Sequence, residues 1–307
     1  MKFLVVGAGA VGGYFGGRLA ENEQDVTFLV REKRNRQLAE TGLIIKSVHG
    51  DFSFQPETIT SGDLGTYDVI LLSTKAYQLD QAISDIAPYV RENTVIIPML
   101  NGMNHIHKLK ERFSDHQVLG GLCFIESDLS PEGFIIQTSQ THRFVFGEWD
   151  GSMTERARNV EHAFNGSKSD SKASRLIVQD MWEKYLFIAA MSSVTTLFRQ
   201  PIGPIREVPE SREFLARLFK ELESVMRQAN APLSEQITEK HMQTIDQMSY
   251  TMKSSMQRDM EKHGNVEAGH LQGYLYNMAN ETGISVPNLH AVYSNLRLYE
   301  KSRESSF

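Results

Sequence analysis

The residues that most clearly suggest a chemistry form a glycine-rich turn near the N-terminus. Gly7-Ala8-Gly9-Ala10-Val11-Gly12 follows the apolar run 3–6 and precedes a helical segment, 14–21, and a second apolar run, 25–30. In such a β-α-β unit the first glycine permits the tight turn, the second admits a pyrophosphate, and the third lets the helix pack on the strand. The helix N-terminus adds free N–H groups and a partial positive charge. The turn therefore predicts a dinucleotide site; a purely structural glycine turn is the alternative.

The residue after the second strand distinguishes the two nicotinamide cofactors. An acidic residue there hydrogen-bonds the ribose 2′-hydroxyl of NAD, whereas an arginine accommodates the 2′-phosphate of NADP. Arg31 occupies that position within a basic cluster, residues 31–36, and its planar guanidinium suits a phosphate. The sequence therefore favours NADPH. Glu32 leaves NAD open as an alternative, and the cluster is also compatible with the solvated start of a helix.

Composition narrows the class of protein. The 307 residues correspond to about two domains, and a hydrophobic content of 40% suffices for two cores. The net charge of −6 argues against general nucleic-acid binding. Cys123 is the only cysteine, which excludes an internal disulfide and predicts a buried structural thiol in a reducing compartment. No apolar run has membrane-spanning length, and the N-terminal glycines argue against a signal peptide; the prediction is a cytoplasmic protein.

Strand patterns dominate the first half of the chain. Nearly continuous Val, Ile and Leu content marks buried strands of a parallel sheet at 69–73, 94–100 and 118–125. The segments 134–138 and 143–146 are typical of a pair of antiparallel edge strands. Together with the opening β-α-β unit, these strands predict an α/β fold with a Rossmann-type, doubly wound parallel sheet.

The second half has a helical pattern. A polar stretch without periodicity, 166–172, separates the two halves, so we place the domains at 1–167 and 168–307. Beyond this stretch the apolar residues recur at helical spacing and predict an all-helical C-terminal domain. The expected helices are 177–198, 211–228, 255–262, 266–282 and 288–301.

Three further residues have types and positions that fit a reaction. Asn101 follows the strand 94–100, where ligands bind in doubly wound folds, although Asn-Gly pairs are also common in plain turns. Lys184 lies on the helix 177–198, whose apolar sequence predicts burial, a lowered pKa and the ability to donate a proton. A solvated lysine or an ion-pair partner of Asp180 is the alternative. Glu267 begins the helix 266–282, where the helix dipole alone explains an acid.

Several motifs together resemble the ketopantoate reductase (2-dehydropantoate 2-reductase) family over essentially the whole chain. The glycine-rich opening is shared by many dehydrogenases, whereas the combination of the later motifs is far more specific. They are STKAYQ at 73–78, PMLNGM at 98–103, WEKY at 182–185, SSMQRDM at 254–260, VEAGHLQGYL at 266–275 and GISVPN at 283–288.

The resemblance implies a reaction and a role for each matching residue. The reaction is hydride transfer from NADPH to the 2-keto group of a small carboxylic acid. Lys184 matches the family's general acid, and Glu267 the glutamate that binds the substrate hydroxyl and helps to place the lysine. Asn101 matches an asparagine near nicotinamide and substrate. Ser255 matches a serine that helps to hold the substrate carboxylate, and Lys75 a lysine on the cofactor side.

The match is incomplete on the lysine helix. Family members that reduce ketopantoate carry asparagines one and two turns after the lysine, lining the substrate pocket, and this chain has Ile188 and Ser192 there. An isoleucine cannot hydrogen-bond, and losing a hydrogen bond to a buried substrate group costs about 1–3 kcal/mol. This difference leaves the substrate open more than the reaction.

Three functional hypotheses follow. The first is NADPH-dependent reduction of a 2-keto acid, with ketopantoate reduced to pantoate, as in the pantothenate pathway, as the leading case. The second is a reductase of a more apolar 2-keto acid. The third is a catalytically weak NADP-binding redox sensor, which would need no proton donor.

The sequence also sets expectations about partners. The ligand is a small 2-keto acid rather than a nucleic acid or a membrane, and a homodimer is one candidate assembly. No metal is expected, since His105 and His107 do not share a helix face. The fingerprint and Lys184 lie in different halves of the chain, so we expect the two halves to form a cleft.

Overall fold

The computed structural model describes residues 1–304 and divides the chain into two compact units. The first contains residues 1–100 and 105–177, and the second contains residues 101–104 and the chain from 178 onward. The boundary between the two units thus lies between residues 177 and 178, whereas the sequence analysis placed the domain boundary between 167 and 168. The difference arises from a short strand, β10 (Asp170–Ala173), which pairs with β9 (Ile135–Gly147) of the first unit. Its polar sequence carries no strand signal, and backbone pairing alone defines it.

The first unit is built on a five-stranded sheet in which every strand pair is parallel. The strand order is β5-β2-β1-β6-β7, and this confirms the doubly wound arrangement expected from the sequence. The strands are β1 (Lys2–Val6), β2 (Asp25–Leu29), β5 (Glu57–Ile59), β6 (Val69–Leu72) and β7 (Val95–Pro98).

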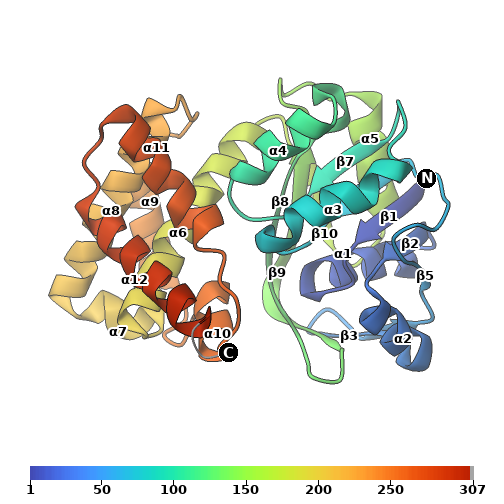
Figure 1. Ribbon diagram of the computed structural model, residues 1–307, viewed down its shortest axis with the longest axis horizontal. Coiled ribbons are helices and arrows are strands. Elements are labelled where there is room, and N and C mark those ends of the chain that lie inside the picture. The colour runs from blue at the N-terminus through green and yellow to red at the C-terminus, as the bar shows by residue number, and fades with distance from the viewer. Residues whose placement is uncertain (305–307) are drawn as a thin grey trace. The chain divides into compact units, whose positions relative to one another are not determined.

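Helices cover this sheet on both sides, with α3 and α4 on one face and α1 on the other (Figure 1). The α-helices are α1 (Ala10–Glu21), α2 (Glu32–Thr41), α3 (Leu79–Ile86), α4 (Asn104–Arg112) and α5 (Glu155–Phe164). Short 3-10 turns are η1 (Ala76–Gln78), η2 (Ala87–Tyr89) and η3 (Asp115–Gln117).

Successive residues of β1 pack into two different cores. Phe3 and Val5 belong to a cluster that also contains side chains of α1 and of a second sheet. Leu4 and Val6 belong to a cluster on the opposite face, together with side chains of α3 and α4. Because both faces are buried from Phe3 to Val6, all four of these positions are apolar, and this is the reason for the continuous runs seen in the sequence.

The second sheet corrects two expectations. Its order is β10-β9-β3-β4, with β8 also paired to β9; the remaining strands are β3 (Leu43–Ser47), β4 (Phe52–Phe54) and β8 (Gly120–Leu129). The run 118–125 is not a buried strand of the parallel sheet, because only Val118 bridges to Ile96 and β8 runs antiparallel to β9. The segments 134–138 and 143–146 are parts of the single strand β9. Strand β8 pairs with both parts, at 135–137 and at 142–147, and its register shifts between Ile125 and Ser127, so that the polar residues 138–141 lie in the irregular part of the ladder.

The glycine-rich turn is packed tightly against the end of β6. Gly7 has a φ of +94°, which only glycine adopts readily. Ser73 donates its hydroxyl proton toward the carbonyl oxygens of Val6 (2.9 Å) and Gly7 (3.1 Å). A Cβ atom on Gly12 would lie 1.9 Å from Ser73 Oγ and 2.3 Å from the carbonyl oxygen of Gly7, whereas one on Gly9 would meet no atom within 4 Å.

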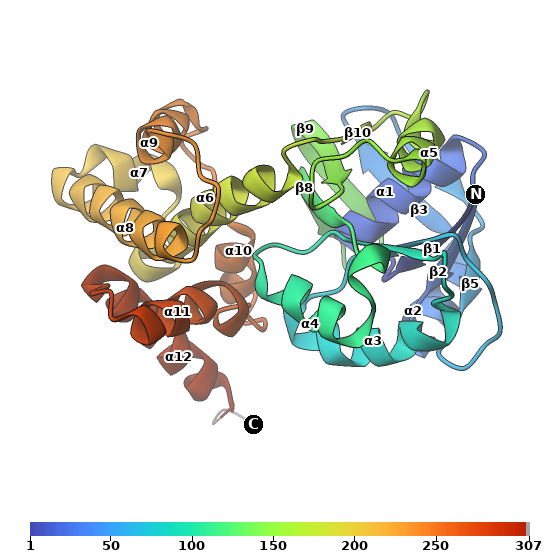
Figure 2. The same ribbon diagram turned by 90° about the horizontal axis from the view of Figure 1, so that it is seen from above.

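The second unit is helical throughout its described residues. Helix α8 packs against α9, α11 and α12 (Figure 2). The α-helices are α6 (Ile177–Phe198), α7 (Ile202–Glu207), α8 (Pro209–Gln228), α9 (Ile237–Gln247), α10 (Ser255–Glu261), α11 (Tyr274–Thr282) and α12 (Pro287–Glu304). A π-helical turn, η4 (Gly269–Gly273), precedes α11, so the expected helix 266–282 is not a regular α-helix. None of the helices within residues 1–304 has the length and hydropathy to cross a membrane.

Substitution of Gly12 by alanine is expected to lower the free energy of unfolding by about 2 kcal/mol, since overpacking exceeds the gain in helix propensity. The added methyl group would clash with a backbone carbonyl that cannot rotate away. Urea denaturation followed by circular dichroism measures this change. Gly9→Ala is the matched control and should unfold as the native chain does. Equal stability of the two variants would contradict the packing argument.

Candidate active site

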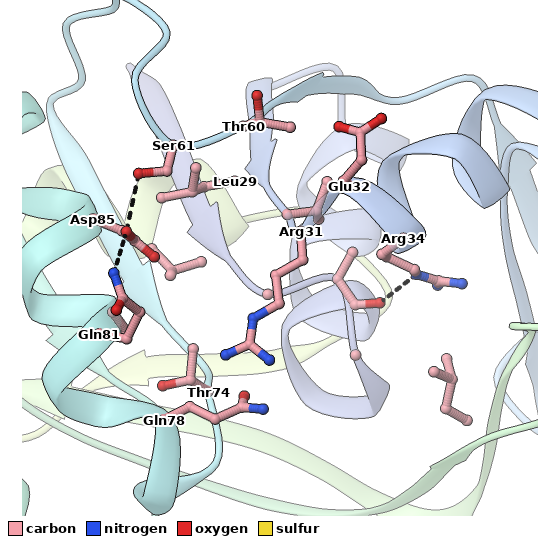
Figure 3. A pocket seen from close by; sticks show the side chains of 17 residues that line it. Leu29, Arg31, Glu32, Arg34, Thr60, Ser61, Thr74, Gln78, Gln81 and Asp85 are labelled. Carbon is pink, nitrogen blue, oxygen red and sulfur yellow. Dashed lines mark hydrogen bonds between the residues drawn. The ribbon is translucent and has the colours of Figure 1, made fainter.

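A cavity of about 610 Å³ lies in the first unit, around the carboxyl ends of β1 and β2. Its floor is formed by the backbone of Gly7, Ala8 and Gly9, and its walls come from the segments 29–34, 60–61 and 74–85. Figure 3 shows the Arg31 side chain in the middle of the lining residues. Ligands bind at this edge of doubly wound sheets, so the cavity occupies the place that the fingerprint predicts.

The glycine turn meets the requirements of a pyrophosphate site. Gly9 is the N-cap of α1 and has no side chain to occupy the first N–H groups of the helix. The space in front of its Cα is open. Of the six fingerprint residues, Gly7, Ala8 and Gly9 line the cavity, whereas Ala10, Val11 and Gly12 form the first turn of α1. Gly12 acts through packing, as expected.

Arg31 extends from the start of α2 into the cavity, toward Thr74 and Gln78 (Figure 3). Glu32, the acidic neighbour that left NAD open, forms an exposed ion pair of 3.0 Å with Arg36 one helical turn later. A third basic residue of the cluster, Arg34, has a structural role: its Nε donates to Ala8 O (3.1 Å), and burial lowers the pKa of its guanidinium. Arg31 and Arg34 therefore both line the cavity, and Arg34 also braces the glycine turn.

Thr74 is a cavity residue that the sequence analysis did not select. Its hydroxyl is buried and has no hydrogen-bond partner within residues 1–304, and it faces the cavity opposite Arg31 (Figure 3). A buried hydroxyl without a partner costs free energy, and a polar ligand would satisfy it. Its position just after β6 was a signal that could have identified it. Lys75, which was selected instead, is half-buried and does not line this cavity.

Lys184 and Asn101 contact each other within the second unit. Lys184 is only 7% exposed on the apolar helix α6, which confirms the predicted burial. Its Nζ donates to Asn101 Oδ1 at 2.9 Å. Lys184 and Asn101, to which the family resemblance gives different roles, thus form one polar pair.

Glu267 lies two residues before η4 and is half-buried. Its carbonyl oxygen accepts from the N–H groups of His270 (3.1 Å) and Leu271 (3.0 Å), so the residue caps the turn. Residues of η4 contact one member of the polar pair and the neighbour of the other. His270 Nε2 donates to Asn101 O at 2.8 Å, and Leu271 O accepts from the hydroxyl of Tyr185, next to Lys184, at 2.6 Å. Tyr185 is fully buried, and burial raises the pKa of its hydroxyl well above the usual value.

The two positions that depart from the family pattern differ in environment. Ile188 is half-buried one turn after Lys184. Ser192 is 2% exposed; it donates to Ile188 O (2.7 Å) and accepts from Gln272 Nε2 (2.8 Å). Ser255 is exposed at the first position of α10, where the preceding Ser254 provides the N-cap. The serine hydroxyl at 192 is therefore engaged by protein groups.

These arrangements define what the site can do. The cavity of the first unit offers backbone N–H groups, an arginine and a hydroxyl to a phosphorylated ligand. The second unit offers a buried ammonium that can donate a proton. Within residues 1–304 no group of three His, Cys, Asp or Glu side chains is arranged to hold a metal ion.

Two family sequence models match the chain. The model described as "Ketopantoate reductase PanE/ApbA" covers residues 3–151, and "Ketopantoate reductase PanE/ApbA C terminal" covers residues 176–300. An "Uncharacterized oxidoreductase YkpB" of Bacillus subtilis (strain 168) is 50% identical over 303 residues, which is 99% of this chain and 100% of that protein. A 2-dehydropantoate 2-reductase of Aquifex aeolicus (strain VF5) is 23% identical over 94% of this chain and 93% of its own.

Solved structures share the fold. A 2-dehydropantoate 2-reductase from Methylococcus capsulatus superposes with a TM-score of 0.88 at 25% identity, covering 99% of this chain and 98% of that one. A D-mandelate dehydrogenase, solved with NADH and anilino(oxo)acetate, superposes with a TM-score of 0.90 at 18% identity and covers 99% of each chain.

Replacement of Thr74 by valine is expected to weaken NADP⁺ binding about fivefold to tenfold, because one hydrogen bond to the ligand is lost. The free protein should become slightly more stable, since a buried hydroxyl without a partner is removed. Titration calorimetry and thermal unfolding measure the two effects. Thr74→Ser keeps the hydroxyl and should bind normally; weakened binding in both variants would contradict the role of the hydroxyl.

Proposed function

The chain belongs to the ketopantoate reductase family of NADP-dependent oxidoreductases, and from that premise we propose that it reduces a 2-keto acid with NADPH. Ketopantoate, whose reduction to pantoate belongs to the pantothenate pathway, is the first substrate to test. The observation that carries the proposal is the buried ammonium of Lys184 held at 2.9 Å from the Asn101 amide. A protein that only senses the cofactor needs no such proton donor.

The residues divide the reaction between them. When bound, the reduced nicotinamide supplies a hydride to C2 of the keto acid. Lys184 stabilises the negative charge that develops on the carbonyl oxygen and transfers a proton from Nζ to it, which gives the 2-hydroxy acid. Solvent then reprotonates the lysine. Asn101 Oδ1 aims the ammonium, and we assign Glu267 to the substrate hydroxyl and Ser255 to its carboxylate.

A more apolar 2-keto acid is the second candidate substrate. Ile188 offers no hydrogen bond, and the Ser192 hydroxyl is already engaged by Gln272. The distal hydroxyl of ketopantoate would therefore find no partner at these two positions. The likeness to the D-mandelate dehydrogenase fold is compatible with this candidate, although it supports the fold alone.

Purified protein is expected to oxidise NADPH with a 2-keto acid, and a matched pair of substrates discriminates between the two candidates. Ketopantoate and 3,3-dimethyl-2-oxobutanoate differ only in the distal hydroxyl. A higher kcat/KM for ketopantoate supports the first candidate, and a higher value for the deoxy compound supports the second. Substitution of Lys184 by alanine should reduce kcat about 100-fold or more with either substrate, as expected for loss of a general acid.

Absence of NADPH oxidation across a panel of 2-keto acids would reject the reductase and favour the sensor hypothesis. Activity of Lys184→Ala within a few-fold of the native enzyme would reject only the proton-donor role. The absorbance of NADPH reports both outcomes.

We propose NADPH over NADH because Arg31 points into the cavity while Glu32 pairs with Arg36. Arg31→Ala is therefore expected to weaken NADPH binding about 10- to 100-fold, as for loss of a charge-assisted pair. Binding of NADH should change less than threefold. Fluorescence titration of both cofactors measures the ratio, and Arg36→Ala is the control from the same cluster. Equal losses for the two cofactors would contradict a 2′-phosphate contact.

A further inference from the structure

Three consecutive residues of the π-helical turn η4 each form a hydrogen bond with a residue at or near the Lys184–Asn101 pair. His270 Nε2 donates to the carbonyl oxygen of Asn101 at 2.8 Å. Leu271 O accepts from the hydroxyl of Tyr185, the neighbour of Lys184, at 2.6 Å. Gln272 Nε2 donates to Ser192 Oγ at 2.8 Å. The turn thus contacts helix α6 at two levels and the segment 101–104 at one.

The turn itself is firmly placed. Its widened hydrogen bond runs from Gly273 N to Ala268 O at 2.8 Å, and turns of this kind are frequent at functional sites. A Cβ on Gly273 would lie 2.8 Å from the hydroxyl of Tyr293, so the turn sits directly against α12. Leu271 and Gln272 are buried. A buried turn of this kind can position the residues that it hydrogen-bonds.

The segment 101–104 lies directly on this turn. Gly102 has a φ of +81°, and a Cβ there would lie 3.0 Å from Leu271 Cδ2 and 3.3 Å from His270 Nε2. Asn101 is consequently held twice: its main-chain carbonyl by His270 and its side-chain amide by Lys184. Both contacts thus act on the same residue.

We propose that His270 is a positioning residue of the reductase reaction: by holding the Asn101 carbonyl, it places the amide oxygen that aims the Lys184 ammonium. This inference rests on the proposed function only for its kinetic consequence. The carbonyl of Asn101 has no proton to give, so Nε2 carries the hydrogen in this bond. The imidazole therefore acts through Asn101 and not as a second proton donor.

The proposal has a kinetic test based on additivity. His270→Ala is expected to lower kcat about 10- to 100-fold, the usual cost of a misplaced catalytic group, with KM changed less than threefold. If the imidazole acts through Asn101, the double variant His270→Ala/Asn101→Ala should be no slower than Asn101→Ala alone. His270→Gln, which keeps an N–H donor, should recover most of the rate.

A second readout does not depend on turnover. Reductive methylation with formaldehyde and a borohydride labels accessible lysines, and mass spectrometry gives the rate at each position. Lys184 is 7% exposed and should react slowly in the native protein. Its labelling should accelerate at least fivefold in His270→Ala and in Asn101→Ala. His290→Ala, an exposed histidine on α12, is the control and should leave the rate unchanged.

The outcomes separate the two proposals. Faster labelling in His270→Ala with no 2-keto acid reduced by the native chain would reject the proposed function and keep the positioning role. Multiplicative losses of kcat in the double variant, or unchanged labelling of Lys184 in His270→Ala, would overturn the role of His270.

Discussion

An ammonium group buried on an apolar helix must be given oxygen acceptors, and much of the second unit is arranged around that requirement. Helix α6 buries Lys184 because its neighbours are apolar on nearly every face. The amide of Asn101 comes from a segment far away in the chain. That segment needs a support of its own, and the π-helical turn η4 provides it through His270. A single desolvated charge thus explains why three separate segments meet.

In the first unit the constraint is the limited space between the glycine turn and Ser73. Its parallel sheet is covered on both faces, and the glycine turn packs tightly against the residue that follows β6. Gly7 and Gly12 let the turn close against Ser73, and Gly9 leaves open the volume in front of the helix terminus. Arg34 donates to Ala8 O and so braces the turn, and both Arg31 and Arg34 line the cavity.

The features that the sequence predicts correctly are those with a local cause. The glycine turn and the apolar helix around Lys184 depend on neighbours within a few residues, and both are confirmed. The sequence predicts two strands, 134–138 and 143–146, where the structure has the single strand β9, and β8 pairs with both parts across a register shift at the polar residues between them. His270 has no local signal at all, since its partner Asn101 lies 169 residues earlier. Contacts of that kind are decided by the tertiary fold.

The engagement of Ser192 by Gln272 also has an evolutionary consequence. Ile188 is half-buried and its side chain makes no hydrogen bond, so a substitution at 188 breaks none. A substitution at 192 instead removes the nearest of the three acceptors of the Gln272 amide, which also contacts Ala189 O and Ser193 Oγ. A change at 192 is therefore coupled to residue 272, whereas a change at 188 is not.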